Sequence, residues 1–325
     1  MFQLLQRFRT SRTTVAGFHP ESPVKPQIPV IIEQIPIIRP EYFPHHEPEC
    51  WLDRKDAHKS IRRLVRGGRL SQADGSLCAQ WVKDGYVIIK GLIDSATIDR
   101  AWAEYEQAIA EGKVTPQKAC SVNGLPGRNL IPHIQVQTIE ALLKDPRITR
   151  IVSMLLGAKC LPFQTITGHN GSEQLEHSDA IHMTTYPMDF LAAAWIAMED
   201  IDPDSGPLVY YPGTHRLPHF LSREADIGIE EFQTNGYAAY REKYEPALQK
   251  MICEQKLEAK YFYGKKGDVL FWHSNLIHGG SQRKNKSLSR KALVCHYFAE
   301  GCVCYHDLAA GLAYIHHDPQ FNVYR

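Results

Sequence analysis

The sequence has no apolar run long enough to cross a membrane and no excess of charge of either sign. A bilayer-spanning helix needs about 20 consecutive apolar residues, and no run in the 325 residues approaches that length. The 37 Lys and Arg residues balance 36 Asp and Glu residues, which leaves a net charge of +1. Without a basic excess to attract phosphates, nucleic acid and anionic membranes are disfavoured as partners.

The chain also lacks the paired cysteines of a zinc or thioredoxin-type site. Its eight cysteines are scattered, and Cys302 and Cys304 form the only close pair in the sequence. Free thiols are typical of a reducing compartment, and the N-terminus has no apolar core of a secretory signal. Arg7, Arg9 and Arg12 leave a mitochondrial-type or surface-binding segment as the alternative to a solvated terminus. We expect a cytoplasmic protein.

Proline is concentrated near the N-terminus. Residues 20–48 hold eight of the 20 prolines, and proline both fixes φ and lacks an amide donor, so this stretch is predicted to be neither a helix nor a central strand. We interpret residues 1–50 as a Pro-rich extension, either a strap lying on the domain or a loose linker. Residues 51–325 are predicted to form a single domain, because a chain of this length can bury a sufficient core.

The pattern of residues changes near position 160. Before it, helical spacing predominates over 71–81, after Asp94 or Ser95, and over 139–156 with an interruption at Pro146, and one strand is predicted at 86–90. After it come eight short β-type runs separated by turn signals: 161–167, 180–186, 190–198, 208–211, 260–263, 268–272, 276–278 and 291–298. This order predicts an α+β fold, with a double-stranded β-helix (a jelly-roll or cupin-like barrel) and flanking helices. Residues 217–259 are too many for a turn and are predicted to form a helical lid.

One His-x-Asp triplet stands out by its context. Residues i and i+2 of a strand lie on the same face, so His177 and Asp179 would converge on one point. A second triplet, from His316 to Asp318, lies in a polar tail with no strand after it. Two histidines and one carboxylate on one face of the metal are the ligands of iron(II) oxygenases, which keep the remaining positions open for cosubstrate and oxygen.

A third ligand is predicted about a hundred residues later. His278 ends a β-run and is followed by two glycines, whereas His273 also follows a β-run and remains the alternative. Arg290 comes twelve residues after His278 and opens an apolar strand, where its guanidinium could hold a carboxylate with two hydrogen bonds. A surface arginine at a strand end is the other interpretation. His182 and His296 either reach the same cavity or belong to the core.

Several motifs extend this pattern in a fixed order. They are DGYVIIKG at 84–91, AWIAMED at 194–200, DSGPL at 204–208 and YPGTHR at 211–216. Together with the triplet and His278, they resemble the phytanoyl-CoA dioxygenase family of iron(II)/2-oxoglutarate oxygenases over residues 79–301. A chance match of all of them in this order is negligible.

The resemblance implies roles for named residues. The metal ligands would be His177, Asp179 and His278. The contacts of 2-oxoglutarate would be Arg290, which pairs with its distal carboxylate, and Trp195, Gln164 and Ser281. In the loop over 121–133, the residues predicted to face the substrate are Asn123, Arg128 and His133.

The resemblance further implies a dioxygenase that uses Fe(II), 2-oxoglutarate and O2 to hydroxylate a C–H bond of a small-molecule metabolite. Related halogenases replace the carboxylate ligand with a small residue, so the presence of Asp179 favours hydroxylation. The alternatives are desaturation, epoxidation or cyclisation at the same iron centre, and a non-catalytic cupin-like metal-binding protein. The sequence predicts no oligomeric state.

Overall fold

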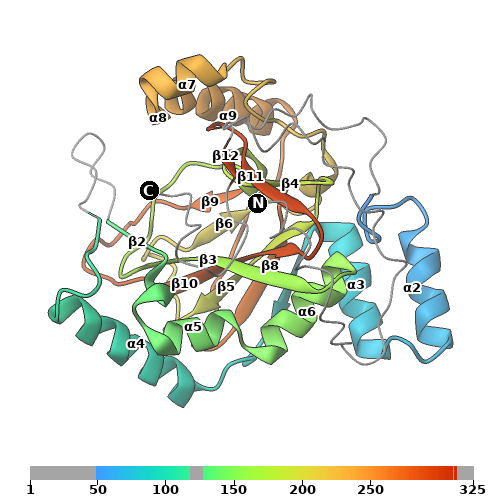
Figure 1. The fold of residues 1–325 in the computed structure, drawn as a ribbon, viewed down its shortest axis with the longest axis horizontal. Helices are drawn as coiled ribbons and strands as arrows, with labels where there is room; N and C mark the ends of the chain where they lie inside the picture. Colours follow the sequence, from blue (N-terminus) through green and yellow to red (C-terminus); the bar gives the residue numbers. More distant parts are fainter. Residues whose placement is uncertain (1–48, 118–126, 310, 313–325) are drawn as a thin grey trace, which may run out of the picture.

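Helices occupy the first part of the described chain and strands most of the second (Figure 1). The structure, a computed structural model, describes residues 49–117, 127–309 and 311–312. The predicted Pro-rich extension lies almost entirely outside these residues, as does the second His-x-Asp triplet. The early helices are α2 (Ala57–Arg66), α3 (Gln72–Asp84), α4 (Ser95–Ala110), α5 (Gln137–Leu143) and α6 (Pro146–Leu156).

Local sequence signals set the ends of these helices. The side chains of Ser71, Asp94 and Asp145 each accept a hydrogen bond from a backbone amide in the first turn of the helix that follows. These bonds satisfy amides that have no partner within the helix. Pro146 occupies the first position of α6, where a missing amide hydrogen costs nothing, so it separates two helices as predicted.

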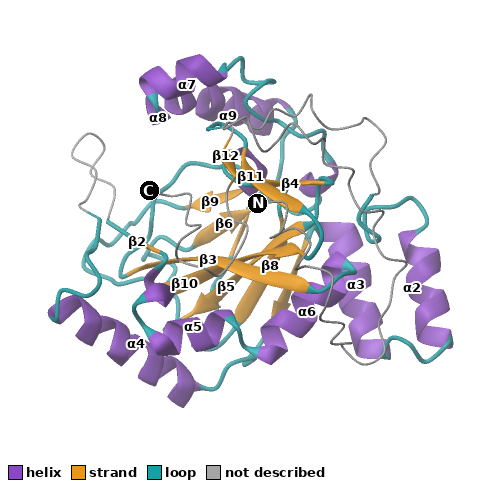
Figure 2. Ribbon diagram, viewed as in Figure 1, coloured by secondary structure: helices purple, strands orange, loops and turns teal. Residues whose placement is uncertain are grey.

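The strands pair in three antiparallel sheets (Figure 2). The first, six-stranded sheet has the order β1 (Tyr86–Ile89), β8 (Val269–His273), β5 (Leu191–Ala197), β10 (Ala292–Ala299), β3 (Cys160–Gly168) and β2 (Asn129–Leu130). The second contains β7 (Lys260–Tyr261), β6 (Leu208–Tyr210) and β9 (His278–Gly280), and the third contains β12 (Gly311–Leu312), β11 (Val303–His306) and β4 (Thr184–Tyr186). The predicted combination of helices with antiparallel strands is confirmed, but the described residues do not pair into one closed barrel.

Two of the predicted strands are placed differently in the structure. The strand predicted at 180–186 is wrong over its first half, because residues Asp179–Ile181 form the 3₁₀-helix η4 and β4 starts only at Thr184. The amides of His182 and Met183 both donate to the carbonyl of Asp179, which curls the chain. The strand predicted at 276–278 is also displaced, because β9 starts only at His278, the last residue of the predicted run. Strand β11 was not predicted.

The six-stranded sheet separates two apolar layers. Alternate side chains of β5 point to opposite faces: Ala192, Ala194 and Ile196 pack in the main core, together with buried residues of the helices. Ala193, Trp195 and Ala197 face the other way, into a cluster that includes Trp272 of β8. Because both faces of β5 are covered, its sequence is continuously apolar rather than alternating.

The insert at 217–259 contains helices α7 (Ile229–Asn235), α8 (Tyr237–Ala239) and α9 (Glu245–Glu254), with a π-helix, η6 (Tyr240–Tyr244), before α9 (Figure 1). Its buried side chains, among them Tyr244 and Leu248, pack with Ile181 and Ile277. Those two residues are close in sequence to Asp179 and His278, so the insert covers the segments that carry the predicted metal ligands. No helix in the described part of the chain is both long and apolar enough to cross a membrane.

Candidate metal centre and cosubstrate site

A two-way backbone bridge joins the segments that carry the two predicted histidine ligands. The amide of His177 donates to the carbonyl of His278 at 2.8 Å, and the amide of His278 donates to the carbonyl of His177 at 2.9 Å. The centroids of the two imidazole rings lie 4.6 Å apart. Residues separated by about a hundred positions thus become neighbours through main-chain pairing.

Asp179 joins this pair through a turn and not through a regular strand. Its Oδ1 lies 3.5 Å from Nε2 of His278. One ligand atom from each of His177, Asp179 and His278 lies within 4.8 Å of the other two. Small rotations of the three side chains would bring these atoms to the bond lengths of about 2.0–2.2 Å that a single ion requires. The predicted convergence is present, although a bridge and a 3₁₀ turn produce it.

The outer nitrogen of each histidine determines which nitrogen faces the centre. Nδ1 of His177 lies 2.9 Å from the carbonyl oxygen of Leu175, and Nδ1 of His278 lies 2.9 Å from that of Leu276. A carbonyl can only accept, so each Nδ1 carries a proton, and Nε2 is the nitrogen whose lone pair can bind a metal. Burial lowers the pKa of His177 to about 3. The ring is therefore neutral, as metal binding requires.

The carboxylate of Asp179 is held by two residues of the six-stranded sheet. Nε1 of Trp272 donates to Oδ2 at 2.7 Å, and Nε2 of His296 lies 3.5 Å from the same oxygen. Burial by itself would raise the pKa of Asp179, but the neighbouring imidazoles of His278 and His296, with the hydrogen bond from His296, lower it. The carboxylate is therefore ionised, with Oδ1 left for the centre. His296, whose role the sequence left open, is placed beside the centre.

The insert also fixes the chain on both sides of His177. The amide of Ser178 donates to Oη of Tyr244 at 3.3 Å. The carboxylate of Glu176 accepts hydrogen bonds from Gln249 of α9 and from Tyr211. The sequence analysis did not assign these roles, nor that of Trp272, because nothing in a local pattern shows which strand or insert residue will reach a ligand.

Arg290 and Trp195 lie together, as predicted for the cosubstrate site. The guanidinium carbon of Arg290 is 5.4 Å from the centroid of the Trp195 ring. Arg290 is 7% exposed, and its Nε has no hydrogen-bond partner among the described residues. Its guanidinium makes one 3.5 Å contact, with the carbonyl of Asn170. Burial, and next the charge of Arg283, lower its pKa to about 10, which leaves it positive at neutral pH. A buried arginine with no carboxylate within 4.0 Å among the described residues fits the carboxylate of a bound molecule.

The other predicted cosubstrate contacts differ in their surroundings. Gln164 of β3 lies opposite His296 of β10, is buried, and its Oε1 has no hydrogen-bond partner. The hydroxyl of Ser281 instead donates to the carbonyl of Pro207 at 2.8 Å. Gln164 thus offers an unused polar atom beside the centre, whereas the recorded hydrogen bond of Ser281 goes to the backbone.

The three predicted substrate residues are placed differently: Arg128 is linked to His177 through Gln174, His133 contacts Thr165 of β3, and Asn123 has no described position. Nη1 of Arg128 donates to Oε1 of Gln174 at 2.8 Å, and Nε2 of Gln174 lies 3.3 Å from Nε2 of His177. His133 is buried, and its Nδ1 is 2.7 Å from Oγ1 of Thr165. Asn123 lies outside the described residues.

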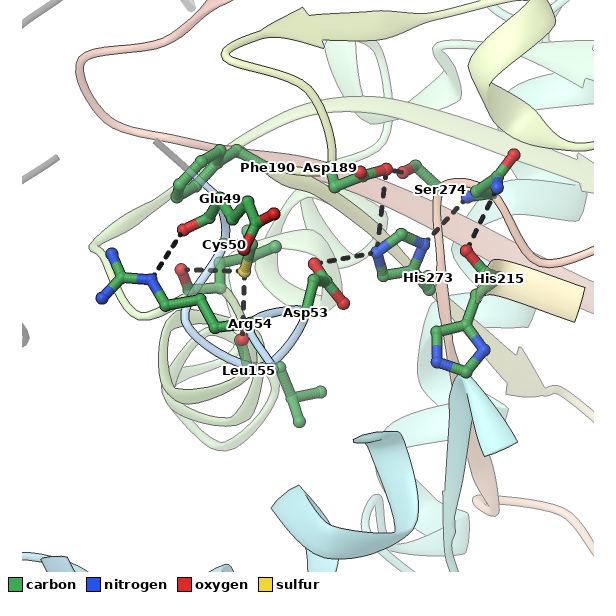
Figure 3. A network of polar contacts seen from close by, with 12 residues as sticks. Glu49, Cys50, Asp53, Arg54, Leu155, Asp189, Phe190, His215, His273 and Ser274 are labelled. Carbon is green, nitrogen blue, oxygen red and sulfur yellow. Dashed lines mark hydrogen bonds and ion pairs between the residues drawn. The ribbon is translucent and has the colours of Figure 1, made fainter. Parts of the chain in front are cut away.

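His273, the alternative third ligand, belongs to a different cluster. Its Nε2 lies 3.3 Å from Oδ2 of Asp53 and 3.8 Å from Oδ1 of Asp189 (Figure 3). Its Nδ1 accepts a hydrogen bond from the amide of Asn275 at 3.0 Å. A nitrogen that accepts carries no proton, so the proton is on Nε2, facing the carboxylates. This tautomer is the reverse of that in His177 and His278 and leaves no lone pair for a metal.

Comparison with known proteins places the chain among the enzymes that the site suggests. The sequence profile of the phytanoyl-CoA dioxygenase (PhyH) family matches residues 81–292, well over half of the chain. The chain belongs to the phytanoyl-CoA dioxygenase (PhyH) family. It is therefore an iron- and 2-oxoglutarate-dependent dioxygenase, which confirms the predicted enzyme class and cofactors.

Curated relatives of this PhyH chain cover about two thirds of its length. Peroxisomal phytanoyl-CoA dioxygenase of Rattus norvegicus is 28% identical over 239 residues, which are 68% of this chain and 67% of the relative. A probable phytanoyl-CoA dioxygenase of Caenorhabditis elegans is 27% identical over 66% of this chain and 72% of the relative. Ectoine dioxygenase of Bordetella parapertussis is 22% identical over 61% and 67%.

Solved structures agree on the fold. The epimerase SnoN in complex with Fe3+, alpha ketoglutarate and nogalamycin RO is 19% identical, with a TM-score of 0.54 over 71% of this chain and 85% of the other. EctD from S. alaskensis with 2-oxoglutarate and 5-hydroxyectoine is 16% identical, with a TM-score of 0.54 over 97% of this chain and 94% of the other. At these identities the similarity establishes the fold alone.

Proposed function

We propose that this PhyH-family dioxygenase hydroxylates a C–H bond of a small-molecule metabolite, with Fe(II) held by His177, Asp179 and His278. The observation that carries the proposal is the set of three buried ligand atoms within 4.8 Å of one another, two of them Nε2 lone pairs oriented by Nδ1–carbonyl hydrogen bonds. Three ligands on one face keep other positions open. Bound iron and 2-oxoglutarate would supply the oxidising chemistry.

The residues around the three ligands have distinct tasks in this proposal. Trp272 and His296 keep the Asp179 carboxylate ionised and turn Oδ1 toward the metal. Tyr244 of the insert holds the backbone between the first two ligands, while the insert itself excludes water from the reacting centre. The retained carboxylate of Asp179 occupies the position that a halide would need, which supports hydroxylation.

Arg290 binds the distal carboxylate of 2-oxoglutarate in this proposal. No carboxylate of the described chain lies within 4.0 Å of its buried guanidinium, and its Nε has no partner there either. Trp195 forms the apolar wall beneath the guanidinium, and Gln164 and Ser281 are the remaining predicted contacts. In the corresponding double-stranded β-helix arrangement, the six-stranded sheet forms one wall of the site, and the sheets of β6 and β4 form the other.

An anaerobic absorption titration tests these assignments. Fe(II) and 2-oxoglutarate together should give the wild-type chain a weak visible charge-transfer band, and His177→Ala should abolish it. Arg290→Gln should keep the band but need about tenfold or more 2-oxoglutarate to reach half its intensity, because a charge-assisted pair is lost.

The matched control is His273→Gln, which removes a buried histidine of β8 that is not one of the proposed ligands. This variant should leave the band unchanged. A wild-type chain without a band, or a band that survives His177→Ala, would contradict the proposed ligands. Succinate release in a metabolite screen then identifies the substrate.

A further inference from the structure

A second arginine beside the metal centre has no carboxylate partner. Arg128 directly precedes β2 and donates to Gln174, which lies next to Nε2 of His177. Among the described residues, no carboxylate lies within 4.0 Å of its guanidinium. Burial lowers the pKa of Arg128, and the side chains of Tyr237 and Tyr240 oppose this lowering. If Arg290 binds the cosubstrate, the charge of Arg128 is left for another molecule.

Two neutral polar side chains lie close to the same histidine. The ring centroid of His182 is 5.3 Å from that of His177 and 5.1 Å from that of Tyr240 in the insert. Both ring nitrogens of His182 and the hydroxyl of Tyr240 are shielded from solvent, and no described residue forms a hydrogen bond with them. Leaving a buried polar group unpaired costs about 1–3 kcal/mol, so these atoms favour a bound molecule that pairs with them.

Arg128, His182 and Tyr240 lie around the same part of the centre. Arg128 is linked to His177 through Gln174, and the ring of His182 lies beside that of His177. The ring of Tyr240 lies beside that of His182. A neutral imidazole and a phenol can each donate one hydrogen bond, while Arg128 supplies the single positive charge.

These donors match a group with one negative charge. A carboxylate has two oxygens and about four lone-pair sites, enough for an arginine and two further donors. A phosphate dianion would keep a second charge without compensation in a buried place, which is costly. The ring of Tyr237 lies next to that of His182, and the ring of Phe232 lies 5.4 Å from that of Tyr237. These two rings suit an apolar or aromatic portion of the bound molecule.

We propose that Arg128, His182 and Tyr240 bind a carboxylate of the substrate, so that the substrate is a small free carboxylic acid. The proposal rests on the proposed function, since it names the substrate class of the same site. An acyl-CoA thioester has no free carboxylate at its acyl end. The proposal therefore separates this chain from the activity that the names of its mammalian relatives state.

Benzoate and benzamide are suitable matched probes, because they share a ring and differ in charge. Calorimetric titrations are made with the chain loaded anaerobically with Fe(II) and 2-oxoglutarate, and with the metal-free chain. Wild type should bind benzoate about tenfold or more tightly than benzamide, and Arg128→Gln should erase this preference. Arg128→Lys should retain part of this preference, because lysine keeps the positive charge but lacks the planar guanidinium that donates two parallel hydrogen bonds.

The matched control is Arg223→Gln. Arg223 is an exposed arginine of the insert that pairs with Glu224, and its removal should leave the preference for benzoate unchanged. Circular dichroism verifies that the variants fold. If Arg128→Gln does not fold, Tyr240→Phe provides the test, with a severalfold weaker affinity for benzoate expected.

Three results would overturn the proposal. They are equal affinity of wild type for the two probes, an unchanged preference in Arg128→Gln, and a weaker affinity of Arg128→Gln for 2-oxoglutarate. The last would assign Arg128 to the cosubstrate. A wild-type chain without a charge-transfer band would instead contradict the proposed function. In that case the titrations of the metal-free chain would still decide whether a carboxylate binds.

Discussion

Two clusters of His and Asp side chains lie in the described part of this chain, and only one of them has the chemistry of a metal centre. His177, Asp179 and His278 form one, and Asp53, Asp189 and His273 form the other. In both, one ligand atom per residue lies within 4.8 Å of the others. Distance alone therefore does not separate them.

The hydrogen bond on the far side of each imidazole separates the clusters. A carbonyl accepts from Nδ1 of His177 and from Nδ1 of His278, so the lone pairs of Nε2 face the centre. At His273 an amide donates to Nδ1, so Nε2 carries the proton that the carboxylates accept. The backbone partner thus decides whether an imidazole binds a metal or donates to a carboxylate.

The carboxylates differ in the same sense. The side chain of Asp179 is 5% exposed and accepts a hydrogen bond from an indole, whereas the side chains of Asp53 and Asp189 are 20% and 22% exposed. Asp189 also accepts from His219 at 2.8 Å (Figure 3 shows Asp189 beside His273). The second cluster joins the segment around Asp53 to the end of β8, which is a structural task.

The largest expected effect is on metal binding. His278→Ala should weaken Fe(II) binding by more than about a hundredfold, because even losing an outer partner of a ligand costs about 10–100-fold. His273→Gln should leave the affinity and the stoichiometry of one ion per chain unchanged. Anaerobic competition with a chelator measures both. Two ions bound per wild-type chain, or a loss in His273→Gln, would remove the distinction between the clusters.

A smaller effect is expected from the indole that holds Asp179. Trp272→Phe removes the 2.7 Å hydrogen bond to Oδ2 and should weaken Fe(II) binding by about 10–100-fold. Trp81→Phe is the matched control, because its indole nitrogen has no partner in the described chain and its ring lies against His273. Its Fe(II) affinity should equal that of wild type. Equal losses in the two variants would show that ring packing and not the hydrogen bond acts on the metal.

The smallest effect concerns the pH dependence of stability at the second cluster. Burial alone would lower the pKa of His219, but the charge of Asp189 and its hydrogen bond raise it above the usual range. His273 opposes this rise and Asp53 adds to it. A raised pKa stabilises the fold fully below the unfolded value of about 6.5, and this stability is lost as the pH rises through the folded pKa.

His219→Gln should therefore destabilise the chain by about 0.5–1 kcal/mol near pH 5.5 and by less near pH 9. Urea unfolding at the two pH values measures the difference. Arg216→Gln, an exposed residue of the neighbouring turn, serves as the control. If His219→Gln lowered the free energy of unfolding equally at both pH values, the variant would have lost packing and not the charge pair.

Most helices, although not α2, and most strands could be predicted because their signals are local. Asp94 starts α4 by accepting a hydrogen bond from the amide of Thr97, and Pro146, which has no amide hydrogen, stands at the start of α6. Both signals act within a few residues. The start of β4 could not be predicted, because the 3₁₀ turn at Asp179 depends on where distant segments accept hydrogen bonds. The amide of Ala180, for instance, donates to the carbonyl of Ser274.

The sequence by itself determined the chemical types available: the ligand residues, the two arginines, the order of the motifs and hence the family. The tertiary structure alone decided which histidine joins His177 and Asp179, since His273 and His278 lie five positions apart and both follow β-type residues. The physical reason is that proton placement on an imidazole depends on partners from other segments. Main-chain pairing between residues a hundred positions apart positions those partners, and no local pattern encodes it.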